Sequence, residues 1–123
     1  MKNIVISINP EHVKNILNGT KKYEYRTRAA KSDVNKIIIY ETTPIKKVVA
    51  EAEIIEVLAM DPEDLWEQTS EYSGITKSFF DSYFNNRDIA YAYKIGKVKK
   101  YDEPKTLQEF GLKSAPQSFA YVG

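Results

Sequence analysis

Two short helices, each marked by a capping residue and a proline, are predicted in a chain that otherwise follows strand patterns. Asn9-Pro10 and Asp61-Pro62 each place a side chain that can cap a helix before a proline suited to the first helical position. In residues 3–8, and again from residue 88, apolar side chains alternate as in half-buried strands. Five or six strands with short helices between them predict an α+β fold built on a small, mostly antiparallel β-barrel.

The same patterns place the remaining elements. We expect strands over residues 3–8, 21–28, 36–43, 47–60, 88–101 and 118–122. The doublets Val48-Val49 and Ile54-Ile55 break the alternation of the long fourth strand and predict a bulge or bend in it. Helices are expected over residues 10–17, 62–71 and 77–84, with one helical turn at 107–110. The helix after Thr76 carries an aromatic stripe that we expect in the core: Phe79, Phe80, Tyr83 and Phe84.

Length and composition exclude several classes of site. The 123 residues fit a single domain spanning residues 1–123, since a domain usually takes roughly 100–200 residues. The lack of cysteine excludes disulfides and thiolate zinc sites. The lone histidine, His12, argues against a histidine metal site or a Ser-His-Asp triad, and it receives no functional assignment. We expect no cofactor. With no signal peptide or membrane-length apolar run, we expect a cytoplasmic protein without a membrane partner.

Charge is unevenly distributed, although the net charge is only +1. Residues 1–50 carry ten Lys or Arg against four Asp or Glu, whereas residues 51–71 carry eight acidic residues and no basic one. One interpretation is a basic face for nucleic acid and an acidic helix turned away from it. The other is an ordinary solvated surface, which charge alone favours because a pI near 7.8 is low for a dedicated nucleic-acid-binding protein.

The predicted strand at residues 21–28 is the first candidate for a functional site. It holds two of the three arginines, Arg26 and Arg28, whose planar donors suit phosphate and carboxylate groups. Because side chains two apart share one face of a strand, we expect one polar row: Lys22, Glu24, Arg26 and Arg28. Tyr23 and Tyr25 would face the other side, in the barrel core. From these residues alone, a solvent-exposed strand surface is the simpler interpretation.

Gly19, Lys21, Glu24 and Arg26 match the motif G-x-K-x-x-E-x-R at every fixed position. This is the motif of the ASCH domains, a branch of the PUA-like superfamily, which the chain resembles over essentially its whole length. The helix before the motif, the isoleucine-rich strand after it and the tail at residues 115–119 are also similar. The resemblance implies a pseudo-barrel with helices packed against it and a cleft lined by the motif strand. It also implies that RNA or a modified nucleoside binds in that cleft.

One branch of these domains resembles an amidohydrolase that removes the acetyl group from the exocyclic nitrogen of acetylcytidine. By that resemblance, Lys21 occupies the position of a functional lysine, and Glu24 stands where that branch has a threonine. The glutamate that the branch takes from its helical segment falls near Ser73, beside Glu71 and Tyr72. Glu24 could supply the missing carboxylate.

Two functions remain open, and the one we favour is a binding module for RNA or a nucleotide-like ligand, acting in the control of transcription or translation. Arg26 and Arg28 would hold phosphate oxygens, and Lys21 would add positive charge. Glu24 would accept hydrogen bonds from a base edge or orient Arg26. Single-stranded or looped RNA suits such a cleft, since its base edges are free. We expect a monomer or a weak homodimer.

The alternative is a small hydrolase of the amidohydrolase or ribonuclease type. Lys21 or Glu24 would be the catalytic acid-base residue, acting on water or on a ribose hydroxyl, while Arg26 would stabilise the developing negative charge. Gln117 and Ser118 are further candidate donors in the cleft. The lack of a metal-binding pattern or a strong catalytic dyad favours the binding module.

Overall fold

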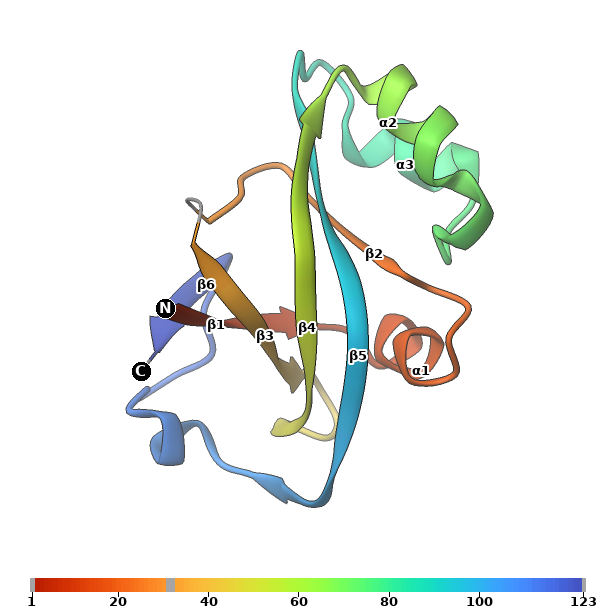
Figure 1. Cartoon of the computed structure of the whole chain (residues 1–123). Helices are drawn as coiled ribbons and strands as arrows, with labels where there is room; N and C mark the ends of the chain where they lie inside the picture. Colours follow the sequence, from red (N-terminus) through yellow and green to blue (C-terminus); the bar gives the residue numbers. More distant parts are fainter. Residues whose placement is uncertain (1, 31–32, 123) are drawn as a thin grey trace.

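A six-stranded mixed sheet forms the centre of the structure, a computed structural model that describes residues 2–30 and 33–122. The strands are β1 (Lys2–Ile8), β2 (Tyr23–Arg26), β3 (Val34–Glu41), β4 (Lys47–Met60), β5 (Ala90–Lys105) and β6 (Phe119–Val122). They follow the order β2-β5-β4-β3-β1-β6, in which β1 and β3 are parallel and the other described pairs antiparallel. Figure 1 shows β4 and β5 running side by side along the molecule. Their ladder shifts register within β4, which confirms the predicted irregularity of that strand.

The α+β class and the mostly antiparallel pairing are confirmed, but a closed barrel is not. The sheet ends at β2 on one side and at β6 on the other, and no ladder joins these two strands within the described residues. The predicted strand over residues 21–28 is shorter in the structure, because β2 has only four residues and pairs with β5 alone. Arg26 at the end of β2 reaches β1 through its side chain instead, by a hydrogen bond to the Ser7 carbonyl.

Helices α1 (Pro10–Leu17) and α2 (Pro62–Thr69) begin where the capping residues and prolines predict. A 3₁₀ turn (Ser70–Tyr72) leads from α2 towards α3 (Lys77–Tyr83), and a second 3₁₀ turn (Leu107–Phe110) forms the predicted helical turn. In Figure 1, α2 and α3 lie together near one end of β4 and β5, and β2 passes between them and α1. None of the helices in residues 2–30 and 33–122 combines the length and apolar character needed to cross a membrane.

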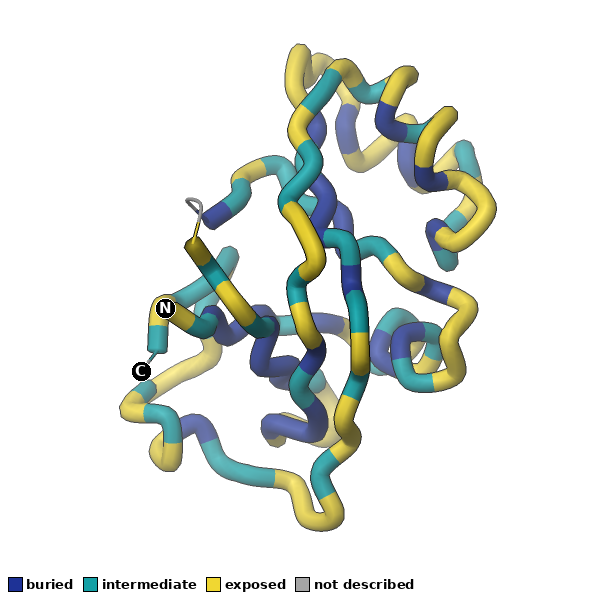
Figure 2. The backbone as a smooth tube through the Cα atoms, viewed as in Figure 1, coloured by how far each residue is buried: buried dark blue, intermediate teal, exposed yellow. Residues whose placement is uncertain are grey.

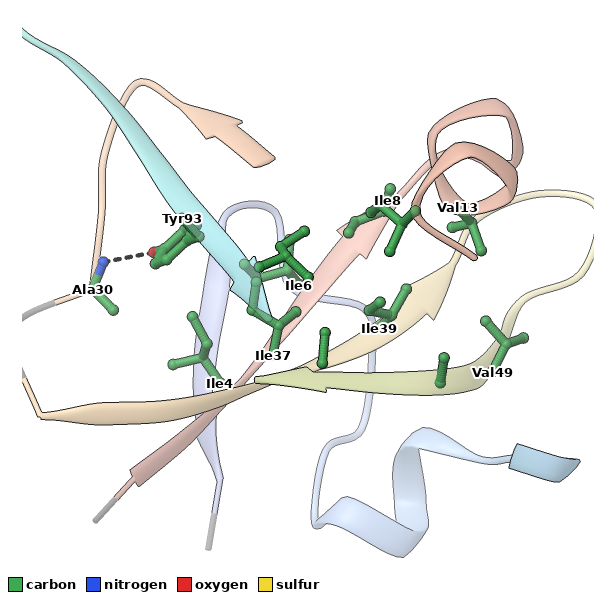
Figure 3. Packing of buried hydrophobic residues seen from close by; sticks show 13 residues of the cluster. Ile4, Ile6, Ile8, Val13, Ala30, Ile37, Ile39, Val49 and Tyr93 are labelled. Atoms are coloured by element: carbon green, nitrogen blue, oxygen red, sulfur yellow. Dashed lines mark hydrogen bonds between the residues drawn. The ribbon is translucent and has the colours of Figure 1, made fainter. Parts of the chain in front are cut away.

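Three groups of buried side chains hold these elements together. Members of the largest group, drawn in Figure 3, pack the sheet against α1: Ile4, Ile6, Ile37, Ile39 and Val13. The second group lies beneath α2 and α3, and the third beneath the Leu107–Phe110 turn. Figure 2 shows the corresponding buried stretches in β1 and β3. In the largest group the buried Tyr93 hydroxyl accepts a hydrogen bond from the Ala30 N–H at 2.8 Å, which anchors the chain that follows β2.

The aromatic stripe of α3 is divided between core and surface, so the prediction that all four rings lie in the core is wrong. Phe80 and Phe84 are buried, and both pack edge-on against Tyr25. Phe79 is 49% exposed and Tyr83 is 38% exposed. Neighbouring residues on a helix point about 100° apart. A helix that turns Phe80 and Phe84 towards the sheet therefore turns Phe79 and Tyr83 away from it.

Candidate functional site

A pocket of about 310 Å³ opens where β1, α1, β2 and α3 meet. This volume is at the lower end of the range for small-molecule sites, roughly 300–1,000 Å³. Three of the four candidate residues, Lys21, Glu24 and Arg26, line it together, whereas Arg28 is exposed beyond the end of β2 and does not. The structure thus brings most of the predicted site into one hollow. The functional role of these residues stays a prediction.

Lys21 is the most deeply buried charged residue of this pocket, with only 2% of its surface exposed. Its Nζ donates to the Ser73 carbonyl at 2.7 Å and lies 4.9 Å from the centre of the Tyr25 ring. Burial lowers the pKa of the Lys21 amine below its ordinary value; Glu24 opposes this shift and Arg26 reinforces it. The amine therefore gives up its proton more readily than an exposed lysine does, which suits it to proton exchange with a ligand.

The turn that follows Tyr72 holds Lys21 in place. The Lys22 N–H donates to the Tyr72 carbonyl at 2.8 Å, so the two segments run against each other. Gly74 approaches so closely that a Cβ added there would lie 2.6 Å from the Cβ of Lys21. Gly74 also has a φ of +69°, a conformation that costs other residues energy. Both features require glycine at this position.

Glu24 and Arg26 form an ion pair on one face of β2, as expected for side chains two residues apart. Arg26 Nε and Nη2 donate to Glu24 Oε2 at 3.1 and 2.8 Å, and Nη2 also donates to the Ser7 carbonyl at 2.9 Å. These donors of the guanidinium are therefore already engaged by protein groups. The other carboxylate oxygen, Glu24 Oε1, is buried without a hydrogen-bond partner. Such an atom is costly unless a ligand supplies a donor.

His12 also lines the pocket, although no motif in the sequence singled it out. Its Nδ1 is buried without a partner, a property that it shares only with Glu24 Oε1 among side-chain atoms of the described residues. Burial and the charge of Lys21 lower the pKa of His12, against smaller opposing effects of Glu24 and Glu11, so the neutral imidazole predominates at pH 7. A sequence feature that could have indicated His12 as a site residue is the Asn9-Pro10 cap, because it puts residue 12 in the first turn of α1, immediately after β1.

Phe79 and Tyr83 form the aromatic wall of the pocket. Their rings are nearly parallel, with 9° between the planes and 6.3 Å between the centres. Phe79 also meets the His12 ring edge-on, with 5.9 Å between the centres. Because both rings of the aromatic wall remain partly exposed, a planar ligand could stack on them.

The predicted polar row on the motif strand is divided by the structure. Lys22 is exposed, and its Nζ lies 4.3 Å from the centre of the Tyr72 ring, outside the pocket. Gln117 and Ser118 do not line the pocket either, although the neighbouring Pro116 carbonyl accepts a hydrogen bond from the Ser7 hydroxyl. In residues 2–30 and 33–122, His, Asp and Glu side chains form no group of three that could hold a metal ion.

Replacing Gly74 by alanine should destabilise the fold more than the same change at Gly111. Both residues have positive φ, +69° and +80°, so each substitution costs about 1–2 kcal/mol of backbone strain. At Gly111 an added Cβ meets nothing within 4 Å, whereas at Gly74 it meets Lys21. Urea denaturation should show an additional loss of about 1–3 kcal/mol for Gly74→Ala, as expected for overpacking. Equal losses in the two variants would contradict the close contact.

Replacing Lys21 by methionine should change how stability depends on pH. The pKa of Lys21 is lower in the folded protein than its ordinary value of 10.5, so the unfolded chain binds more protons. The contribution of Lys21 to the free energy of unfolding therefore rises as pH rises towards 10.5. Urea denaturation at several pH values should show wild type gaining stability relative to Lys21→Met between pH 7 and 10. A difference that stays constant with pH would mean that this amine is not desolvated.

The chain resembles solved structures over nearly its whole length. A crystal structure of ASCH from Zymomonas mobilis matches it with a TM-score of 0.89 at 26% identity, covering 99% of this chain and 88% of that one. A mutant of the same protein matches with a TM-score of 0.90 at 25% identity, covering 100% and 91%.

The curated relatives are longer proteins, and this chain matches only part of each of them. The large ribosomal subunit protein uL22 of Ureaplasma parvum is 31% identical over 97% of this chain, but the chain spans only 39% of that protein. The ASCH domain-containing ribonuclease of Zymomonas mobilis is 30% identical over 93 residues, which are 75% of this chain and 63% of that protein. The ASCH domain family itself matches residues 6–104, and with this match the chain belongs to the ASCH domain family.

Proposed function

We propose that this chain binds RNA by taking the base of one unpaired nucleotide into the pocket, against the aromatic wall. The observation that carries the proposal is the combination of two surfaces in one hollow. Phe79 and Tyr83 offer partly exposed aromatic rings. Polar and charged side chains that line the same pocket form what we call the polar floor: His12, Lys21, Glu24 and Arg26. Control of transcription or translation is the setting that we propose for this binding, with residues 1–123 acting as a single domain.

Each surface supports a different part of the recognition. Exposed rings stack on nucleobases, and such stacking contributes about 1–3 kcal/mol per base as judged by alanine substitution. The polar floor supplies hydrogen-bonding groups that can meet the edge of a base. Single-stranded or looped RNA suits this arrangement because its base edges are unpaired. Arg28, which is exposed beyond β2, is the arginine that we propose for phosphate contact, since donors of Arg26 are engaged by Glu24 and Ser7.

The relatives support an RNA-related function in general, without bearing on the way in which the pocket would bind a base. One Zymomonas mobilis relative is named as an ASCH domain-containing ribonuclease. Two others carry unrelated names, although 97% of this chain matches each of them. They are uL22 and ATP synthase subunit alpha of Ureaplasma parvum, of which the chain spans 39% and 15%. Those two names concern proteins much longer than the matched segment, so we carry neither activity over to this chain.

A second candidate is RNA hydrolysis in the same pocket, and the burial of Lys21 favours it. A lysine whose pKa lies below its ordinary value is a better general base near neutral pH. Lys21 would take the proton of a ribose 2′-hydroxyl, and the 2′-oxygen would attack the adjacent phosphorus. The 5′-oxygen of the next nucleotide would leave with a proton taken from water, so that a 2′,3′-cyclic phosphate forms, and Lys21 would return its proton to the solvent. In an amidohydrolase reaction on a nucleoside amide, Lys21 or Glu24 would take a proton from water, the resulting hydroxide would attack the amide carbonyl, and the amine would leave with that proton.

Removing the ring of Phe79 should weaken RNA binding. For Phe79→Ala we expect the affinity for a fluorescently labelled single-stranded RNA to fall roughly 5- to 150-fold, which corresponds to about 1–3 kcal/mol of lost stacking. Ile55→Ala is the matched control, because it removes a side chain that is 60% exposed on β4 and outside the pocket. Fluorescence anisotropy at one fixed salt concentration measures both affinities. Unchanged affinity in Phe79→Ala would refute the stacking role.

Hydrolysis and binding can be separated with end-labelled RNA. If the second candidate is correct, wild type releases fragments that end in a 2′,3′-cyclic phosphate, and Lys21→Met releases none. Lys22→Met is the control, since Lys22 is the exposed neighbour outside the pocket. RNA that remains intact with folded wild-type protein would argue against hydrolysis and leave the binding function in place.

A further inference from the structure

Two buried side-chain atoms lack hydrogen-bond partners in the described part of the chain, and both belong to residues that line the pocket. They are Glu24 Oε1 and His12 Nδ1. Glu24 is only 5% exposed, so water at the surface does not readily satisfy its free oxygen. Buried polar atoms are nearly always hydrogen-bonded in native proteins. Two unsatisfied atoms on residues that line one pocket therefore indicate where a ligand makes its hydrogen bonds.

The chemistry of these two atoms restricts the ligand. Glu24 pairs with Arg26 through Oε2, so it is a carboxylate and its free oxygen can only accept a hydrogen bond. The neutral imidazole of His12 accepts at Nδ1 in the tautomer that carries its proton on Nε2. A ligand that satisfies both atoms must bring two hydrogens. A phosphodiester group of RNA brings none at neutral pH, and it would place negative charge beside the Glu24 carboxylate.

The guanidinium of Arg26 does not alter this restriction. Its Nε and Nη2 already donate to Glu24 and to the Ser7 carbonyl. Arg26 is partly buried, and the adjacent Glu24 carboxylate balances its charge, which weakens its attraction for a phosphate. The two free acceptors, Glu24 Oε1 and His12 Nδ1, therefore favour a neutral hydrogen-bond donor over an anion.

We infer that the pocket selects nucleobases that carry an exocyclic amino group and excludes the phosphate, with Glu24 Oε1 and His12 Nδ1 accepting the two amino hydrogens. The ring of the base lies against the aromatic wall, and the ribose and phosphate lie outside the pocket. This inference rests on the proposed RNA-binding function and specifies the ligand group for the same pocket. Adenine, cytosine and guanine carry an amino group, whereas uracil does not.

A ligand series on the unchanged protein tests the inference directly. Adenosine, cytidine, guanosine and uridine are titrated into isotope-labelled protein and followed by NMR, together with N6,N6-dimethyladenosine and inorganic phosphate. We expect the three amino-bearing nucleosides to bind roughly 10- to 150-fold more tightly than uridine and the dimethylated compound, because a hydrogen bond to a charged group is lost. Inorganic phosphate should neither shift the pocket resonances nor displace a bound nucleoside.

A substitution at His12 tests whether this residue contributes to the preference for amino-bearing nucleosides. His12→Phe keeps a ring beside Phe79 but removes Nδ1, so the preference for adenosine over its dimethylated form should shrink several-fold. Glu67→Gln removes an exposed carboxylate of α2, outside the pocket, and should change nothing. The ligand series needs no variant, so it remains decisive even if His12→Phe does not fold.

The inference is overturned if uridine binds as tightly as cytidine, if phosphate competes with the nucleosides, or if no nucleoside binds. Its failure is distinguishable from that of the proposed function. RNA binding that depends on Phe79 but shows no preference among bases would overturn this inference alone. RNA that does not bind at all would overturn the proposed function.

Discussion

The hydrogen bond from Arg26 to the Ser7 carbonyl is the contact on which the pocket depends. Three strands separate β2 from β1 in the sheet, so no ladder holds these two strands together. The guanidinium bridges them, donating to Ser7 at 2.9 Å and to Glu24 Oε2 at 2.8 Å. It thereby draws the two strands together on the pocket side without closing the sheet. A carboxylate and a carbonyl both accept hydrogen bonds from the guanidinium, and these bonds offset the cost of partly burying its charge. One oxygen of Glu24 is left for a ligand.

The sequence predicts those parts of this fold that depend on interactions between residues close together in the chain. The cap residues and prolines locate the starts of α1 and α2, because both signals act within one helical turn. The two-residue spacing of Glu24 and Arg26 predicts that they share a face of β2. Closure of the sheet cannot be predicted in this way, because it depends on whether β2 and β6, far apart in the chain, find each other. The exposure of Phe79 depends likewise on which side of α3 meets the sheet.

The limits of sequence reasoning are clearest at Lys21 and His12. The family resemblance implies that Lys21 lies in the cleft, but the sequence does not predict that its amine is buried against the Ser73 carbonyl, 52 positions away, beside Gly74. His12 has no motif around it and becomes part of the site because α1 begins directly beside the end of β1. With Arg26 engaged internally, the site differs in character from a phosphate clamp. It is a largely buried set of hydrogen-bonding groups beside an aromatic wall.

A nucleotide that binds this protein should place its base in the pocket and leave its phosphate outside. A crystal structure of the protein with adenosine 5′-monophosphate tests this most directly, because one ligand offers both groups to the same site. We expect the adenine ring to lie against Phe79 and Tyr83, with its amino group at Glu24 and the phosphate of the nucleotide in solvent. A phosphate bound at Arg26, with the base outside the pocket, would contradict it.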